Sequence, residues 1–177
     1  MTPAEAEPLV SVESLIAVLG AAGLGTILGH LLAAAKDRRE VRSRALAAIQ
    51  HVEELRWAPF DARELSAAMR DAGAALMLAR VPRAVTRRYL LCAHAASIVS
   101  KDDYDQFPTP EGGGLPGNLD ELVALAGRAA LAVVWNPWIG RLRAYFLLAR
   151  ATRLEAAVPA GSSVANALTA AKRRAIT

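Results

Sequence analysis

An uninterrupted apolar run is the first pattern in the chain. Residues 15–35 read LIAVLGAAGLGTILGHLLAAA and contain no Asp, Glu, Lys or Arg. A helix rises 1.5 Å per residue, so about 21 residues reach across the ~30 Å hydrocarbon layer of a bilayer. The pattern predicts one transmembrane helix at residues 15–35, preceded by a short extracytoplasmic segment at residues 1–14. A cleaved signal peptide is the alternative, but such peptides begin with positive charge and have a shorter apolar stretch.

Small residues recur at every fourth position of this run. They form one stripe on a helix: Ala17, Ala21, Gly25, Gly29 and Ala33. In lipid, close approach of two backbones over such a stripe is a known mode of helix association. Two interpretations stay open, a self-associating helix and a plain anchor, because an Ala-rich sequence often has small residues at this spacing.

Apolar residues continue at three- and four-residue steps after the run, which is the period of a helix. No Gly or Pro lies between Gly29 and Pro59, so the membrane helix is expected to continue as one rod to about Trp57. Helix-start signals and prolines predict further helices at about 61–81, 83–100, 118–135 and 138–158. No segment alternates with a period of two. We therefore predict an all-α fold, in which the transmembrane helix continues into a cytoplasmic bundle of about four amphipathic helices within residues 36–158.

Two stretches lack the helical period. Residues 101–118 contain three prolines and four glycines, which predicts a long loop. Residues 159–177 are small and polar until the cations at 172–174. They are expected to form a basic C-terminal tail that frays or makes one weakly held turn.

The helix at residues 138–158 has two interpretations. Its expected inward positions are Ile139, Leu142, Phe146 and Ala149. Its expected outward positions are Arg141, Arg143, Arg150 and Arg153. The favoured interpretation places the aromatic side chains in the bundle core. The alternative is a membrane-surface helix, which combines aromatic and basic side chains in this way, and its candidate contact residues are Trp135, Trp138, Arg141 and Arg143.

Charge is distributed unevenly along the chain. All 21 Lys and Arg side chains lie from Lys36 onward, whereas residues 1–35 carry only glutamates. Five cations follow the apolar run directly: Lys36, Arg38, Arg39, Arg42 and Arg44. Positive flanks stay in the cytoplasm and lie near lipid headgroups, so the N-terminus is expected outside and the remaining chain inside the cell (inner) membrane. Arginine greatly outnumbers lysine, which we interpret as a sign of a GC-rich bacterial genome.

Composition and motifs give little support for catalysis. The hydrophobic fraction is 54% but aromatic residues make up only 5%, and this Ala- and Leu-rich composition favours helices. Motifs for nucleotide phosphates, zinc proteases and serine hydrolases are absent. The single cysteine, Cys92, is two residues from His94 and so lies on another helix face, which predicts a buried structural thiol. Asp102, Asp103 and Asp105 are expected to form a solvated acidic cluster. We predict no catalytic residue, no metal and no cofactor.

Three functions are compatible with these patterns. The first is a membrane-tethered interaction or regulatory module, whose partners are the lipid bilayer, an unknown protein and, through the small-residue stripe, further copies of itself. The second is a membrane-perturbing oligomer, such as a holin-like protein or a defence effector. The third is an enzyme with a site in the loop at 101–118. The basic charge does not favour nucleic acid, because no recognisable nucleic-acid-binding motif accompanies it.

Overall fold

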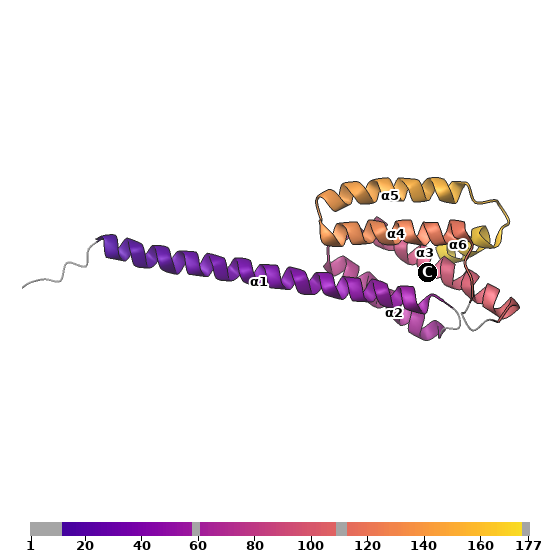
Figure 1. Ribbon diagram of the computed structural model, residues 1–177, viewed down its shortest axis with the longest axis horizontal. Coiled ribbons are helices and arrows are strands. Elements are labelled where there is room, and N and C mark those ends of the chain that lie inside the picture. The colour runs from indigo at the N-terminus through magenta and orange to yellow at the C-terminus, as the bar shows by residue number, and fades with distance from the viewer. Residues whose placement is uncertain (1–11, 58–60, 109–112, 175–177) are drawn as a thin grey trace, which may run out of the picture. The chain divides into compact units, whose positions relative to one another are not determined.

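The computed structural model is all-helical in the residues that it describes. These are residues 12–57, 61–108 and 113–174 for the backbone, and the same residues apart from 12–32 and 34 for the side chains. Six helices and no strand occur within those ranges (Figure 1). They are α1 (Val12–Leu55), α2 (Ala62–Leu78), α3 (Arg83–Gln106), α4 (Gly117–Trp135), α5 (Ile139–Ala156) and α6 (Ser163–Arg174). The predicted all-α class is confirmed.

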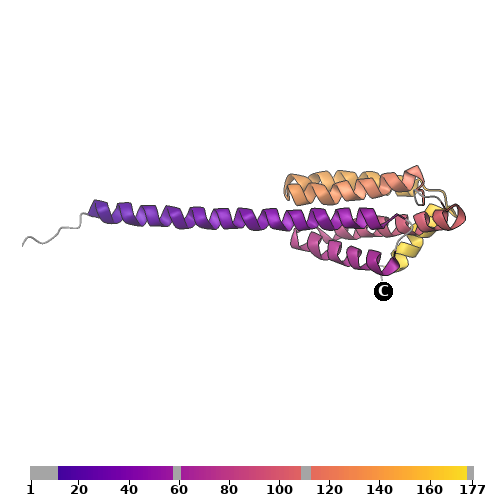
Figure 2. The same cartoon turned by 60° about the horizontal axis from the view of Figure 1, so that its bottom comes forward.

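The chain divides into two compact units, residues 1–39 and residues 40–177. The described hydrophobic core belongs to the second unit and contains buried side chains from Ala45 to Ala171. Within it, α3 contacts α2, α4 and α6, while α5 packs mainly on α4. Figures 1 and 2 both show α4 and α5 lying side by side. A helical bundle is therefore confirmed, and it includes α6, which lies beyond the predicted limit at residue 158.

The period of apolar residues identified the buried faces of α2, α3 and α4 correctly. Leu65, Leu76, Tyr89, Cys92 and Val133 are all buried. Alanine occupies many positions between them, and its short side chain lets neighbouring helices approach closely. The helices therefore form where local periodicity and Ala-rich propensity agree.

Helix boundaries differ from the prediction at three places. Helix α3 continues through Lys101 to Gln106, so the first part of the expected loop at 101–118 is helical. Helix α4 begins at Gly117 behind Pro116, and Asn118 lies inside its first turn. The expected frayed tail contains α6, which buries Val164, Ala167, Leu168 and Ala171. These side chains recur at three- and four-residue steps, so packing on α3 stabilises a helix that small, polar residues would not form alone.

No helix in the described part of the chain is both long enough and apolar enough to cross a bilayer. Most side chains of the predicted transmembrane helix at residues 15–35 lie outside the described residues. The same holds for four positions of the small-residue stripe, Ala17, Ala21, Gly25 and Gly29, whereas Ala33 is exposed. The backbone of residues 12–55 is helical without interruption, and this helix of 44 residues ends at Leu55, close to the expected end at about Trp57. The membrane crossing itself stays a prediction.

Candidate functional site

Helix α5 packs on its neighbour through small residues. Its buried positions are Gly140, Ala144 and Ala151, which recur at helical spacing and so share one face. Gly140 lies so close to α4 that an added Cβ would be 2.1 Å from the backbone oxygen of Ala132. No side chain larger than hydrogen fits at that contact without moving the backbone. The close approach of the two helices therefore selects the small-residue face of α5 as its inner face.

Five large apolar side chains of α5 and the turn before it point away from the core, whereas Leu147, Leu148 and Leu154 are partly buried against it. Trp138 is 86% exposed, and Ile139, Leu142, Tyr145 and Phe146 are each more than 60% exposed. The favoured sequence interpretation, with Ile139, Leu142 and Phe146 inward, is wrong. Both faces of this helix are apolar, so hydrophobicity alone does not distinguish them. The Gly140, Ala144 and Ala151 pattern was the overlooked signal, because small residues at this spacing permit the close packing that large ones prevent.

The turn between α4 and α5 holds two tryptophans at the start of this exposed surface. The Asn136 side-chain oxygen accepts hydrogen bonds from the backbone N–H groups of Trp138 and Ile139, both at 3.1 Å. The backbone oxygen of Asn136 also accepts a hydrogen bond from Gly140 N at 2.7 Å. Trp135 remains 60% exposed on the α4 side of the turn. These bonds order the turn and thereby fix where both indole rings emerge.

Arginines flank the exposed apolar side chains on both sides. At 3.6 residues per turn, Leu142 and Phe146 lie along the middle of the outward face, Arg141 lies along one edge, and Arg143 and Arg150 share the other. Arg153 continues the middle of the face beyond Phe146. We call this surface the α5 outer face, and its members are Trp135, Trp138, Ile139, Arg141, Leu142, Arg143, Tyr145, Phe146 and Arg153.

The cations of the α5 outer face are available for an external partner. Arg150, at its edge, is bound to Glu121 of α4 at 2.6 Å. Arg141, Arg143 and Arg153 have no acidic partner among the residues that the structure describes. The surface therefore combines exposed aromatic area with uncompensated positive charge.

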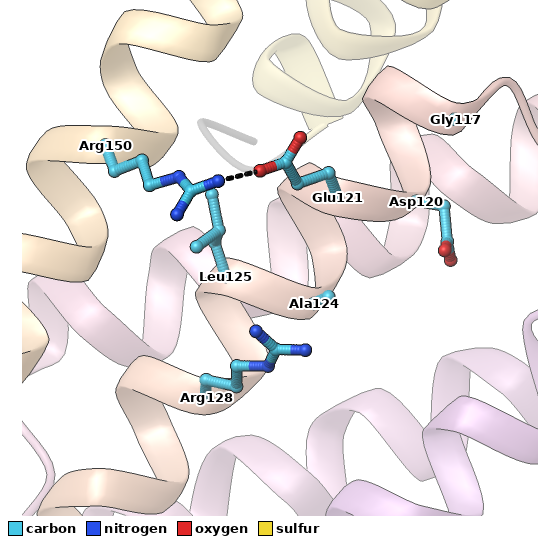
Figure 3. A pocket seen from close by; sticks show the side chains of 7 residues that line it. All are labelled: Gly117, Asp120, Glu121, Ala124, Leu125, Arg128 and Arg150. Carbon is cyan, nitrogen blue, oxygen red and sulfur yellow. Dashed lines mark hydrogen bonds and ion pairs between the residues drawn. The ribbon is translucent and has the colours of Figure 1, made fainter.

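A hollow of about 310 Å³ lies beside Arg150 on the surface of α4 (Figure 3). Its lining is Gly117, Asp120, Glu121, Ala124, Leu125, Arg128 and Arg150. Figure 3 shows Glu121 and Arg150 joined across the hollow. Asp120 is paired with Arg56 at 3.5 Å. Two acids and two cations balance one another here, so the hollow does not favour a ligand of either charge.

Cys92 and His94, which were considered for enzymatic chemistry, lie in different surroundings. Cys92 is fully buried, as predicted, and burial raises the pKa of its thiol to about 11. The thiol is therefore protonated at neutral pH, and it is a poor nucleophile in that form. Burial, and then the nearby Arg174 guanidinium, lower the pKa of His94. His94 lines a separate groove between α3 and α6.

The acidic cluster at the end of α3 helps to hold the following chain. Asp103 accepts a hydrogen bond from the backbone N–H of Gly114 at 2.6 Å, and the Ser100 hydroxyl donates to the Gly113 oxygen at 3.1 Å. Asp102 and Asp105 are exposed. In the described residues, no three His, Cys, Asp or Glu side chains are placed to hold a metal ion.

The five cations after the predicted membrane helix lie along α1. Lys36, Arg38, Arg39 and Arg44 are exposed, and Arg42 is half-buried. Arg44 pairs with Glu40 at 2.5 Å. Their role in setting topology stays a prediction.

Comparisons with other proteins found no matching family model, no matching curated protein and no matching solved structure.

Proposed function

We propose that this chain is a membrane-tethered helical interaction module without catalytic activity. The helix at residues 15–35 crosses the inner membrane, and the bundle lies in the cytoplasm. The observation that carries the proposal is the α5 outer face, where a folded domain leaves several large apolar side chains in contact with water. Contiguous apolar surface of this kind marks sites that bind a protein or a membrane.

The sequence supports the tether. An uncharged run of sufficient length precedes a body that contains every Lys and Arg in the chain. That order satisfies both the length requirement and the charge asymmetry of a single-pass protein with its C-terminal domain inside. The small-residue stripe in the same run supports self-association as a further property of the anchor.

Alkaline carbonate extraction of membranes tests the tether. The full-length chain should stay in the pellet and be released only by detergent. A double substitution, Leu24→Arg with Leu28→Arg, should release it, because an arginine at the bilayer centre costs about 3 kcal/mol on insertion scales. The matched control, Leu24→Ile with Leu28→Ile, should behave like the natural chain. Recovery of the natural chain in the aqueous fraction without detergent would refute the tether.

Cross-linking in native membranes tests the interaction role. A module that presents the α5 outer face should yield adducts, with protein or with photoreactive lipid, that disappear when Leu142 and Phe146 are replaced by Ser. The corresponding change of Met77 and Leu78, which are exposed on α2, is the control. Adducts that are equally abundant in both variants would contradict the assignment of this face.

A further inference from the structure

We propose that the α5 outer face lies on the anionic surface of a lipid bilayer, with the helix axis parallel to the membrane. This inference rests on the proposed function, because it names the partner of the same surface. It commits to lipid headgroups and the adjoining acyl chains as the occupant.

The arrangement of side chains fits an interfacial helix. Leu142 and Phe146 lie along the centre of the face and can enter the boundary between headgroups and acyl chains. Arg141 on one edge, and Arg143 on the other, have long apolar stems that let their charged ends reach headgroup phosphates. Trp135 and Trp138 stand at one end of the helix, and tryptophan prefers this same interfacial depth. The apolar centre, the basic edges and the terminal tryptophans of this face thus all fit the interface between headgroups and acyl chains.

Charge favours anionic lipid over a second copy of this chain. The only acidic residue of α5 is Glu155, which binds Arg88 of α3 and Lys172 of α6. Pairing two α5 outer faces about a two-fold axis would therefore bring Arg141, Arg143 and Arg153 of both copies together without an acidic partner. Like charges placed together across an interface disfavour association. A bilayer that contains anionic lipid offers negative charge over the whole area of the face.

The test uses the full-length chain reconstituted in lipid vesicles, with Trp138 as the only tryptophan. Replacing Trp57 and Trp135 by Phe achieves this. Vesicles are made of phosphatidylcholine alone or mixed with phosphatidylglycerol, in each case with acyl chains brominated to quench nearby tryptophan. We expect strong quenching of Trp138 in the anionic vesicles and weak quenching in the neutral ones. Raising the salt concentration from 0.1 to 1 M shortens the Debye length from about 10 to about 3 Å and should reduce the quenching.

Removing the arginine charges of the α5 outer face should release this face from the membrane surface. Each arginine near an anionic surface contributes a roughly fivefold preference, so the triple change Arg141→Gln, Arg143→Gln and Arg153→Gln should shift docking roughly a hundredfold toward the undocked state. The matched control neutralises three exposed arginines elsewhere in the bundle, Arg63, Arg70 and Arg87, and should retain the quenching. Circular dichroism must show equal helix content in all variants. The salt titration of the natural arginines tests the proposal even if the triple variant does not fold.

The outcomes separate this inference from the tether. If Trp138 fluorescence stays unquenched in anionic vesicles while the chain resists carbonate extraction, the docking is overturned and the tether stands. Quenching in a chain that carbonate releases supports the docking and overturns the tether. Equal quenching in neutral and anionic vesicles would overturn anionic lipid as the partner. So would a salt-resistant dimer that is lost when Leu142 and Phe146 are both replaced by Ser.

Discussion

Arg56 illustrates at the residue scale how this bundle accommodates a buried charge. It is only 7% exposed, and it donates to Glu53 at 2.6 Å and lies 3.5 Å from Asp120 of α4. Its guanidinium also stacks 4.3 Å from the centre of the Trp57 ring. Glu53 accepts a further hydrogen bond from the Tyr89 hydroxyl at 3.0 Å, and burial followed by this carboxylate raises the pKa of Tyr89. Glu53 therefore links the end of α1 to α3.

Replacing Glu53 by Ala should destabilise the bundle by about 2 kcal/mol. The change leaves the Arg56 charge buried without its closest partner, and such losses cost about 3–5 kcal/mol when both groups are fully buried. The smaller value is expected here because the Glu53 side chain is 33% exposed. Urea unfolding followed by circular dichroism measures the difference. Glu54→Ala is the control, since Glu54 is exposed and contacts only the neighbouring turn of α1, Gln50 at 3.1 Å and His51 at 4.0 Å, among the described residues. Equal effects of the two changes would contradict the linking role.

At the element scale, α5 shows how close backbone contact determines which face is buried. Gly140 makes the tightest contact with α4, whereas Gly117 at the start of α4 has open space where a Cβ would lie. The two glycines therefore differ in what an added methyl group would meet, and they form a matched pair.

Gly140→Ala should destabilise the bundle by about 2 kcal/mol, because overpacking that forces backbone shifts costs about 1–3 kcal/mol. Gly117→Ala should be neutral or slightly stabilising, since it only reduces the freedom of the unfolded chain. Thermal unfolding of both variants measures this. A Gly140→Ala protein as stable as the Gly117→Ala protein would refute the close packing of α5 on α4.

Glu155 joins three elements and should make stability depend on acid pH. Burial by itself raises the pKa of Glu155, but hydrogen bonds and charge from Lys172 and Arg88 outweigh burial, so its pKa is lowered from 4.5. The stabilisation is therefore fully present above about pH 4.5 and is lost as the pH falls through the lowered value. Glu155→Gln should lower stability at pH 7 and reduce its decline below pH 4.5. Unfolding free energies at pH 7 and pH 3 measure this, and an acid decline as steep in Glu155→Gln as in the natural chain would contradict it.

At the scale of the whole molecule, the asymmetry of charge is expected to set orientation. Residues 1–35 have no Lys or Arg, and the cations begin at Lys36. Cytoplasmic retention of Lys and Arg near a membrane helix determines which end stays inside. The cations at the junction should therefore matter more than those in the folded body.

Reversing that asymmetry should give mixed or inverted insertion. The change combines Lys36, Arg38 and Arg39 to Gln with Glu5 and Glu7 to Lys. Protease added to intact spheroplasts should then reach a C-terminal tag that is protected in the natural chain. Neutralising Arg63, Arg70 and Arg87 instead should leave the tag protected. A tag that stays fully protected after the reversal would contradict charge-directed topology.

The sequence by itself determined the helical class and the buried faces of most helices. The period of apolar positions is a local property, and it identified Leu76, Tyr89 and Val133 as core residues. It underestimated the width of the buried face of α4, which also includes Val123 and Val134. It did not predict α6, because the small residues of that segment gain stability only by packing on α3.

Only the tertiary structure decided the candidate site. Helix α5 has large apolar side chains on its outer face, and its inner face combines Gly140, Ala144 and Ala151 with Leu147, Leu148 and Leu154, so burial of either face is compatible with its sequence. The approach of Gly140 to Ala132 selects the face that carries the small residues, since a bulky side chain there would overlap the backbone of α4. Which of two apolar faces is buried depends on the shape of the neighbouring helix, and that shape exists only after the bundle has assembled.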